Sequence, residues 1–227
     1  MPTGLLYDVH ANLPALEAVL ADAAQRGVDR FVLGGDFTLF GAWPAETLAR
    51  LRELDAEWIR GNGERWTANP DEAPDAVQAA VAACRELLGE ETVAELARLP
   101  FSLTKGDTLF CHASPISDVE SFLPAASDDD ERLLEGVTQP RVVFGHTHIQ
   151  FRRPGPGGVE LVNPGSVGMP VDGDHRAAYA VLGDDGKVQL CRVAYDHAAS
   201  AAAVRERFGA AGELTARRIE RARMRVD

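Results

Sequence analysis

Aspartate, asparagine and histidine recur in short motifs along the first two thirds of the chain, most of them beside glycine. The motifs are Asp8-Val9-His10, Gly34-Gly35-Asp36, Gly61-Asn62, His112 and Gly145-His146-Thr147-His148. Imidazole together with carboxylate is a ligand set for Mn, Fe, Ni, Zn or Co, and the lack of a thiolate in these motifs disfavours a soft-metal site. The sequence therefore predicts a metal centre built from two aspartates, one asparagine and four histidines.

Each motif follows a segment that we expect to be a β-strand. The expected strands are residues 3–7, 31–33, 57–59, 108–111 and 142–144. Ligands of open α/β sheets bind outside the carboxyl ends of the strands, so these ends should bring the motifs to one rim. In D-x-H and H-x-H, residues two apart point the same way if the chain is extended, so both could reach one small site.

Amphipathic stretches between these strands predict helices. We expect helices at 13–26, 45–53 and 75–99, the last broken near Gly89, and a short one that begins at the acidic run 127–131. After Gly145, short runs at 160–162, 177–182 and 187–193 are typical of antiparallel strands, and helices at 198–208 and 213–225 end the chain. This order predicts two packed sheets with helices outside, in a single domain over residues 1–227.

Composition excludes several classes of protein. With 23 Lys and Arg against 35 Asp and Glu among 227 residues, the formal charge is −12, which disfavours long nucleic acids and anionic membranes as partners. No apolar run approaches the ~20 residues that a bilayer requires, and the N-terminus does not resemble a signal peptide. Three cysteines without a CxxC spacing indicate a reducing, cytoplasmic setting. The negative net charge does not exclude a phosphate-bearing substrate, because a bound metal ion makes the local electrostatic potential positive.

Taken together and in this order, the motifs resemble those of the calcineurin-like metallophosphoesterase superfamily, whose pattern is D-x-H, G-D, G-N-H-[DE], a histidine and G-H-x-H. Residues 163–168 and Asp172-Gly173-Asp174 resemble the small prokaryotic phosphodiesterase branch of that family. The resemblance extends to about Tyr195. It implies an α/β fold in the form of a four-layer αββα sandwich, with two mixed β-sheets flanked by helices.

The resemblance also implies a centre of two divalent metal ions, with Mn foremost and Fe, Ni, Zn or Co as alternatives. Asp36 would bridge the two ions. The first ion would be held by Asp8, His10, Asp36 and His148, and the second by Asp36, Asn62, His112 and His146. Two such cations, two carboxylates and a bridging hydroxide leave a charge of about +1, which attracts phosphate, and the hydroxide would attack phosphorus in line.

Roles beyond metal binding follow from the same resemblance. Asp36, Asn62 and His112 are the expected catalytic residues. The candidate substrate contacts are Asn12, Asn62 and His112, although Asn12 also fits the N-cap of the first helix.

One position departs from the family pattern. Gly63 stands where the family usually has a histidine assigned as general acid, and Glu64 remains without a histidine to orient. Losing a positioned acid typically slows hydrolysis of a poor leaving group by ~10²–10⁴-fold. We therefore expect phosphodiesters or activated monoesters as substrates, rather than simple alkyl monoesters. His175 is either an exposed loop residue or a replacement acid.

These observations favour a metal-dependent enzyme that hydrolyses small phosphate esters, and a homo-oligomer is compatible with the family. The alternative is a non-catalytic binding or scaffold protein on the same fold, which the missing histidine favours, or a sensor that binds without turnover.

Several other residues could have either a functional or a structural role. Trp43 and Trp66 could line a substrate pocket or pack in the core, residues 65–99 could form a lid or a helical layer, and Arg176 could contact phosphate or pair with Asp172 or Asp174.

Overall fold

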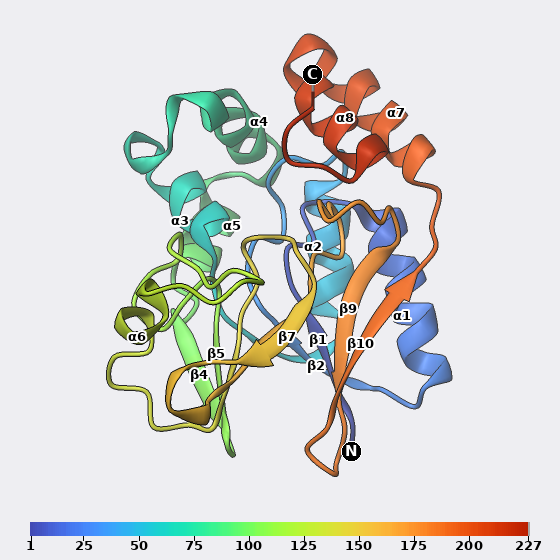
Figure 1. Ribbon diagram of the computed structural model, residues 1–227. Helices are drawn as coiled ribbons and strands as arrows, with labels where there is room; N and C mark the ends of the chain where they lie inside the picture. Colours follow the sequence, from blue (N-terminus) through green and yellow to red (C-terminus); the bar gives the residue numbers. More distant parts are fainter. Residues whose placement is uncertain (227) are drawn as a thin grey trace.

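The computed structural model describes residues 1–226 and contains two five-stranded sheets packed face to face (Figure 1). In the first sheet the strand order is β10-β9-β1-β2-β3. The strands are β1 (Thr3–Leu6), β2 (Arg30–Leu33), β3 (Asp55–Trp58), β9 (Ala177–Leu182) and β10 (Val188–Val193). β1, β2 and β3 run parallel, whereas β9 and β10 are antiparallel to their neighbours. The carboxyl ends of β1, β2 and β3 therefore lie at one edge.

The second sheet has the order β4-β5-β6-β8-β7. Its strands are β4 (Ser102–Lys105), β5 (Thr108–Cys111), β6 (Arg141–Val143), β7 (Phe151–Pro154) and β8 (Glu160–Asn163). The expectation that the strands after Gly145 are all antiparallel is wrong for β8, which pairs in parallel with β6. β4 and β7 are edge strands that sequence reasoning did not find, because their polar residues and Pro154 lack an apolar run.

Side-chain alternation along β1 separates two cores. Leu5 and Tyr7 point between the sheets and pack against Val32, Phe110 and Val143. Leu6 points the other way, into a second cluster on the outer face of the first sheet. Helices α1 (Leu13–Gln25) and α2 (Pro44–Arg52) cover that face.

A third cluster covers the outer face of the second sheet. Phe122 and Leu133 pack there against Val142 and Phe144. The helix on this side, α6, is short (Asp129–Leu133) and begins in the acidic run. The order helix, sheet, sheet, helix is the four-layer αββα sandwich that the sequence predicts.

The remaining helices lie around the carboxyl ends of the parallel strands (Figure 1). They are α3 (Asn62–Ala68), α4 (Gln78–Leu88), α5 (Glu90–Ala97), α7 (His197–Phe208), η4 (Gly209–Gly212) and α8 (Glu213–Arg221). The predicted break near Gly89 is confirmed, since this residue has φ +76° between α4 and α5. The last helix ends at Arg221 rather than at residue 225, because Ala222 is left-handed. Among residues 1–226, no helix combines the length and apolarity needed to cross a membrane.

Leu16 tests the core beneath α1, where it is fully buried. Leu16→Ala removes packed methyl groups and leaves a cavity, so we expect the free energy of unfolding to fall by about 2–5 kcal/mol. The control is Glu17→Ala, which removes an exposed ion pair with Arg50 and should cost less than about 1 kcal/mol. Urea unfolding measures both, and equal losses would contradict the layer assignment.

Candidate metal centre

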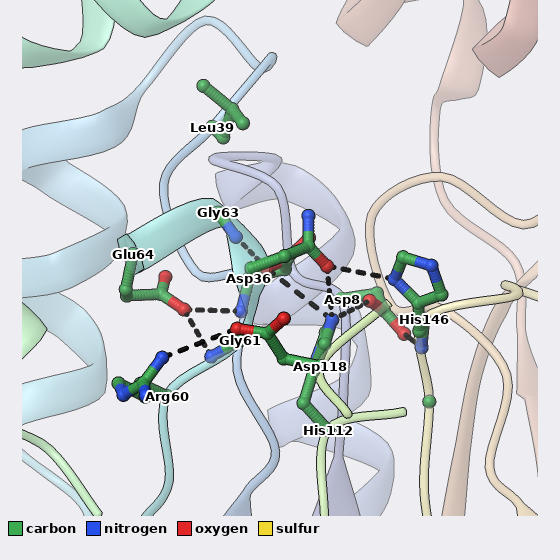
Figure 2. A network of polar contacts seen from close by, with 12 residues as sticks. Asp8, Asp36, Leu39, Arg60, Gly61, Gly63, Glu64, His112, Asp118 and His146 are labelled. Atoms are coloured by element: carbon green, nitrogen blue, oxygen red, sulfur yellow. Dashed lines mark hydrogen bonds and ion pairs between the residues drawn. The ribbon is translucent and has the colours of Figure 1, made fainter. Parts of the chain in front are cut away.

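The structure brings the seven predicted ligands together where strands of both sheets end. Figure 2 shows four of them, Asp8, Asp36, His112 and His146. Asp8 and His10 follow β1, and Asp36 follows β2. Asn62 opens α3 after β3. His112 follows β5, and His146 and His148 follow β6. All are buried except His146, which is partly exposed at the rim.

One group of ligands is built around two histidines that face each other. The Nε2 atoms of His10 and His148 are 3.0 Å apart, and that of His148 is 3.5 Å from Asp8 Oδ1. The Nδ1 atoms lie 3.0 Å from the carbonyl oxygen of Leu39 and 2.7 Å from that of Met169. A carbonyl can only accept, so each Nδ1 donates its proton and each Nε2 faces inward. Burial lowers the pKa of His10, so its Nε2 accepts, whereas the negative charge of Asp8 outweighs burial and raises the pKa of His148, whose Nε2 can donate to it. A cation bound by both Nε2 atoms would take the place of that proton.

A second group surrounds His112. Its Nδ1 lies 2.8 Å from the carbonyl oxygen of Gly34, so Nε2 faces inward, 3.0 Å from Asn62 Oδ1. His146 Nδ1 is 2.8 Å from the same amide oxygen. Three electron-rich atoms thus converge. Alternatively, with the amide of Asn62 turned, its nitrogen donates to both rings. The carboxamide can therefore face a cation with its oxygen or the imidazoles with its nitrogen.

Two carboxylates lie between the groups. Asp36 directs Oδ1 toward His112 Nε2, at 3.5 Å, and Oδ2 toward His10 Nε2, at 3.8 Å. Asp8 belongs to both groups of candidate ligands, and its fully buried Oδ1 has no hydrogen-bond partner. An unpaired buried carboxylate oxygen is costly unless a cation satisfies it. The residues present therefore fit metal ions. Asp8, like the predicted bridging ligand Asp36, lies near the ligands of both groups.

Burial and neighbouring charges together set the pKa values of these side chains. Burial lowers the pKa of His10 to about 3 and that of His146 to about 4, which keeps both rings neutral and able to coordinate. Burial also raises the pKa of Asp36 to about 7, and the negative charges of Glu64 and Asp8 add to this rise against the opposing effect of His112. A bound cation would favour the ionised carboxylate of Asp36.

The ligand-bearing turns are left-handed. The expectation of extended D-x-H and H-x-H segments is wrong, because Asp8, His10, Asp36, His146 and His148 all have φ between 49° and 65°. They make up five of the eight non-glycine residues with positive φ within residues 1–226. Such residues cost about 1–3 kcal/mol each and persist only where the surrounding structure holds them.

Glu64 holds one of these turns through its carboxylate (Figure 2). Oε2 accepts hydrogen bonds from the main-chain N–H groups of Asp36 and Gly61, and Oε1 accepts one from Phe37, all at 2.8 Å. Glu64 has no neighbouring histidine to orient, and instead it fixes the main chain of the candidate ligand Asp36. Sequence reasoning missed this role, although a glutamate at the N3 position of α3 is a capping-box signal.

Gly63 supports the same aspartate. Its N–H donates to Asp36 Oδ1 at 2.6 Å, and a Cβ at this position would lie only 2.7 Å from that oxygen. The residue that departs from the family pattern thus touches the predicted bridging ligand with its main chain. It offers no side chain that could deliver a proton.

An acidic residue outside the motifs, Asp118, lies beside the centre (Figure 2). It is nearly buried and accepts two hydrogen bonds of 2.7 Å from Arg65 and one of 3.3 Å from Arg60. No motif marks Asp118, because its partners come from distant parts of the chain. The two arginines balance the charge of Asp118, and Arg65 also pairs with Glu72.

Asn12 does not join the site. Its Nδ2 donates to Gly168 O and Tyr195 Oη, and its Oδ1 accepts from Ala15 N and Ser200 Oγ. The N-cap role is confirmed, because Oδ1 accepts from Ala15 N. Partners within the protein occupy both polar atoms of the amide, and the substrate contact stays a prediction.

The other candidates of the sequence also lie outside the ligand set. His175 stacks on His197 with ring centroids 4.5 Å apart, and Arg176 pairs with Asp174 rather than Asp172. Trp43 and Trp66 pack against apolar clusters. The segment 65–99 contains the remainder of α3, together with α4 and α5.

Glu64→Gln tests the support of Asp36. The amide must turn an NH₂ group toward a main-chain donor, so we expect a loss of about 1–3 kcal/mol in the free energy of unfolding. We also expect Mn²⁺ affinity to fall by about tenfold or more, as for other outer contacts of metal ligands. Urea unfolding and calorimetric titration measure the two effects. Glu91→Gln, an exposed change on α5, is the control, and wild-type Mn²⁺ affinity in Glu64→Gln would refute the role.

The chain is similar to several known proteins. A sequence profile of the calcineurin-like phosphoesterase superfamily domain matches residues 1–186. An uncharacterized protein of Methanocaldococcus jannaschii is 28% identical over 216 residues, covering 85% of this chain and 87% of that protein. The crystal structure of a metallophosphoesterase from Sphaerobacter thermophilus is 29% identical, with a TM-score of 0.83 over 98% of this chain and 100% of that chain.

A hypothetical protein from Pyrococcus horikoshii OT3 shares the fold, with 20% identity and a TM-score of 0.82 over 93% of this chain and 96% of that chain. The matched superfamily domain covers most of the chain and includes every predicted metal ligand. The protein therefore belongs to the calcineurin-like phosphoesterase superfamily.

Proposed function

We propose that this protein hydrolyses small phosphodiesters or activated phosphomonoesters with the help of two divalent cations, Mn²⁺ foremost. The observation that carries the proposal is the convergence of ligand atoms around Asp8 Oδ1. Three imidazoles that are tied to main-chain carbonyls turn Nε2 toward this region, and the oxygen itself has no hydrogen-bond partner among residues 1–226. Membership in a phosphoesterase superfamily supports the same chemistry.

The ligand atoms divide between two positions. His10 and His148, with Asp8, would hold the first cation, and His112, Asn62 and His146 would hold the second, with Asp36 between them. Bound cations of this kind make water a nucleophile at neutral pH and polarise phosphate oxygens. The buried ligands fix the cations in place, and the partly exposed His146 marks the side from which a phosphate approaches.

Three residues have proposed catalytic roles. Asp36 has one carboxylate oxygen toward His10 and the other toward His112, so it would contribute to both cation positions. Asn62 and His112 lie in contact beneath the rim, where they would hold the second cation and face the phosphate. A rigid placement matters here because misplacement by about 1 Å can slow a reaction ~10²-fold.

The substrate class follows from the leaving group. Gly63 supplies no proton donor, and the adjacent Arg65 is a permanent cation bound to Asp118. A leaving group that departs without protonation, such as a phenolate, suits this arrangement. We therefore place phosphodiesters and activated monoesters ahead of alkyl monoesters.

The missing histidine also favours a second candidate, a non-catalytic scaffold or sensor. A scaffold without metal would have to stabilise the buried Asp8 and Asp36 with main-chain hydrogen bonds and protonated histidines alone. A metal-binding sensor would use the cations instead. Metal content and turnover, measured on the same sample, separate the three possibilities.

Replacing a ligand at the rim tests the proposed reaction. His146→Ala removes a ligand of the second cation, so we expect hydrolysis of bis(4-nitrophenyl) phosphate with Mn²⁺ to fall by at least about 10²-fold. His197→Ala, a histidine at the start of α7 outside the centre, is the control and should keep wild-type activity. Full activity of His146→Ala would overturn the site assignment. Two bound metals without turnover on any ester would favour the sensor.

Leaving-group dependence tests the role of Gly63. We expect kcat/KM for bis(4-nitrophenyl) phosphate to exceed that for glycerol 2-phosphate by about 10²-fold or more, since the structure places no proton donor at this position. Steady-state kinetics with both substrates at saturating Mn²⁺ gives the ratio. Faster hydrolysis of the alkyl monoester would mean that another group supplies the proton.

A further inference from the structure

A separate cavity lies between α4 and the turn that joins α7 to α8. Its volume is about 310 Å³. Residues 38, 40, 41 and 44 form one wall, α4 a second, and the α7–η4–α8 turn the third. In Figure 1, α4 and the α7–α8 pair stand on opposite sides of the same end of the molecule. None of the lining residues is a candidate metal ligand, so this cavity does not depend on the proposed hydrolysis.

The cavity opens to solvent and is large enough to hold a small molecule. A water molecule occupies only about 30 Å³ in the liquid. Small side chains create the space, since α4 presents Ala80 and Ala83 toward it. The rings of Phe40 and Phe208 line it while remaining only partly buried, so apolar surface is left uncovered.

The lining favours a hydrocarbon over a heterocyclic base. Apart from the thiol of Cys84 and one arginine, its polar side chains are two threonines, and Thr38 Oγ1 already accepts from Cys84 Sγ. A base would bury several donors and acceptors without partners, which is costly. An alkyl chain needs no such partners and gains from burial.

The mouth of the cavity has one charge. Arg207 is exposed, lines the opening, and makes no hydrogen bond or ion pair within the described residues 1–226. Arg205, two residues earlier, is by contrast paired with both Glu213 and Glu220. An unpaired guanidinium beside an apolar cavity is complementary to a carboxylate at the end of an alkyl chain.

We propose that this cavity is a binding site for a medium-chain carboxylate, with the alkyl chain between α4 and Phe208 and the carboxylate at Arg207. The site adjoins the metal-bearing loop. Phe40 packs its ring 5.3 Å from that of His10, and the preceding residue, Leu39, accepts the hydrogen bond of His10 Nδ1. A ligand in the cavity would therefore touch the loop that positions His10 and Asp36.

Calorimetric titration of the full chain with decanoate, below its micelle concentration, tests the proposal. We expect one saturable site per chain. Ala83→Trp fills the cavity and should weaken binding at least about tenfold. Ala82→Trp places the same ring on the exposed side of α4 and should bind as wild type. Thermal unfolding of each variant shows whether it is folded.

The charge is tested separately, with a variant that leaves the cavity intact. Arg207→Gln should weaken decanoate binding about twofold to fivefold and leave binding of the neutral decanol unchanged. Arg98→Gln, an exposed arginine on another helix end, is the control. Absence of a saturable decanoate site overturns the proposal. So does a folded Ala83→Trp variant that binds as wild type, or an Arg207→Gln variant that binds decanoate as tightly as the wild type.

Discussion

The rest of the site depends on one electrostatic constraint, the crowding of electron-rich atoms in a buried space. Main-chain carbonyls fix the proton of each of three imidazoles on Nδ1 and leave each Nε2 facing its neighbours. Asp8 adds a buried oxygen without a hydrogen-bond partner among residues 1–226. In a protein interior such a cluster needs positive charge, because electron-rich groups repel at low dielectric. The negative charges of Asp8 and Asp36 outweigh burial and raise the pKa of His112 and His148, so protons can supply this charge, and bound cations would take their place.

The fold tolerates this arrangement because rigid elements surround it. Strand ends of two sheets deliver the ligands, and left-handed turns at Asp8, His10 and Asp36 aim them. Glu64 then fixes the turn after β2 with three main-chain hydrogen bonds. Contacts outside the ligand set thus stabilise the left-handed turns, and this keeps the candidate ligands in a fixed arrangement.

Much of this organisation could be predicted from the sequence, because the signals are local. Apolar runs mark the central strands, and the ligand types that follow them mark the rim. The edge strands β4 and β7 gave no such signal, since polar residues suffice where one side is solvent. Other features depend on tertiary contacts between distant segments. These are the left-handed turns, the pairing of Asp118 with two arginines, and the hydrogen bonds of Asn12 with Gly168 and Ser200. The periodicity of the sequence does not indicate such contacts.

The central claim is that the seven side chains hold two cations, and anomalous diffraction from crystals grown with Mn²⁺ tests it most directly. The account predicts two peaks, one against His10, His148 and Asp8 and one against His112, Asn62 and His146, with Asp36 between them. A map without peaks at these positions, or with manganese bound only elsewhere on the acidic surface, would contradict it.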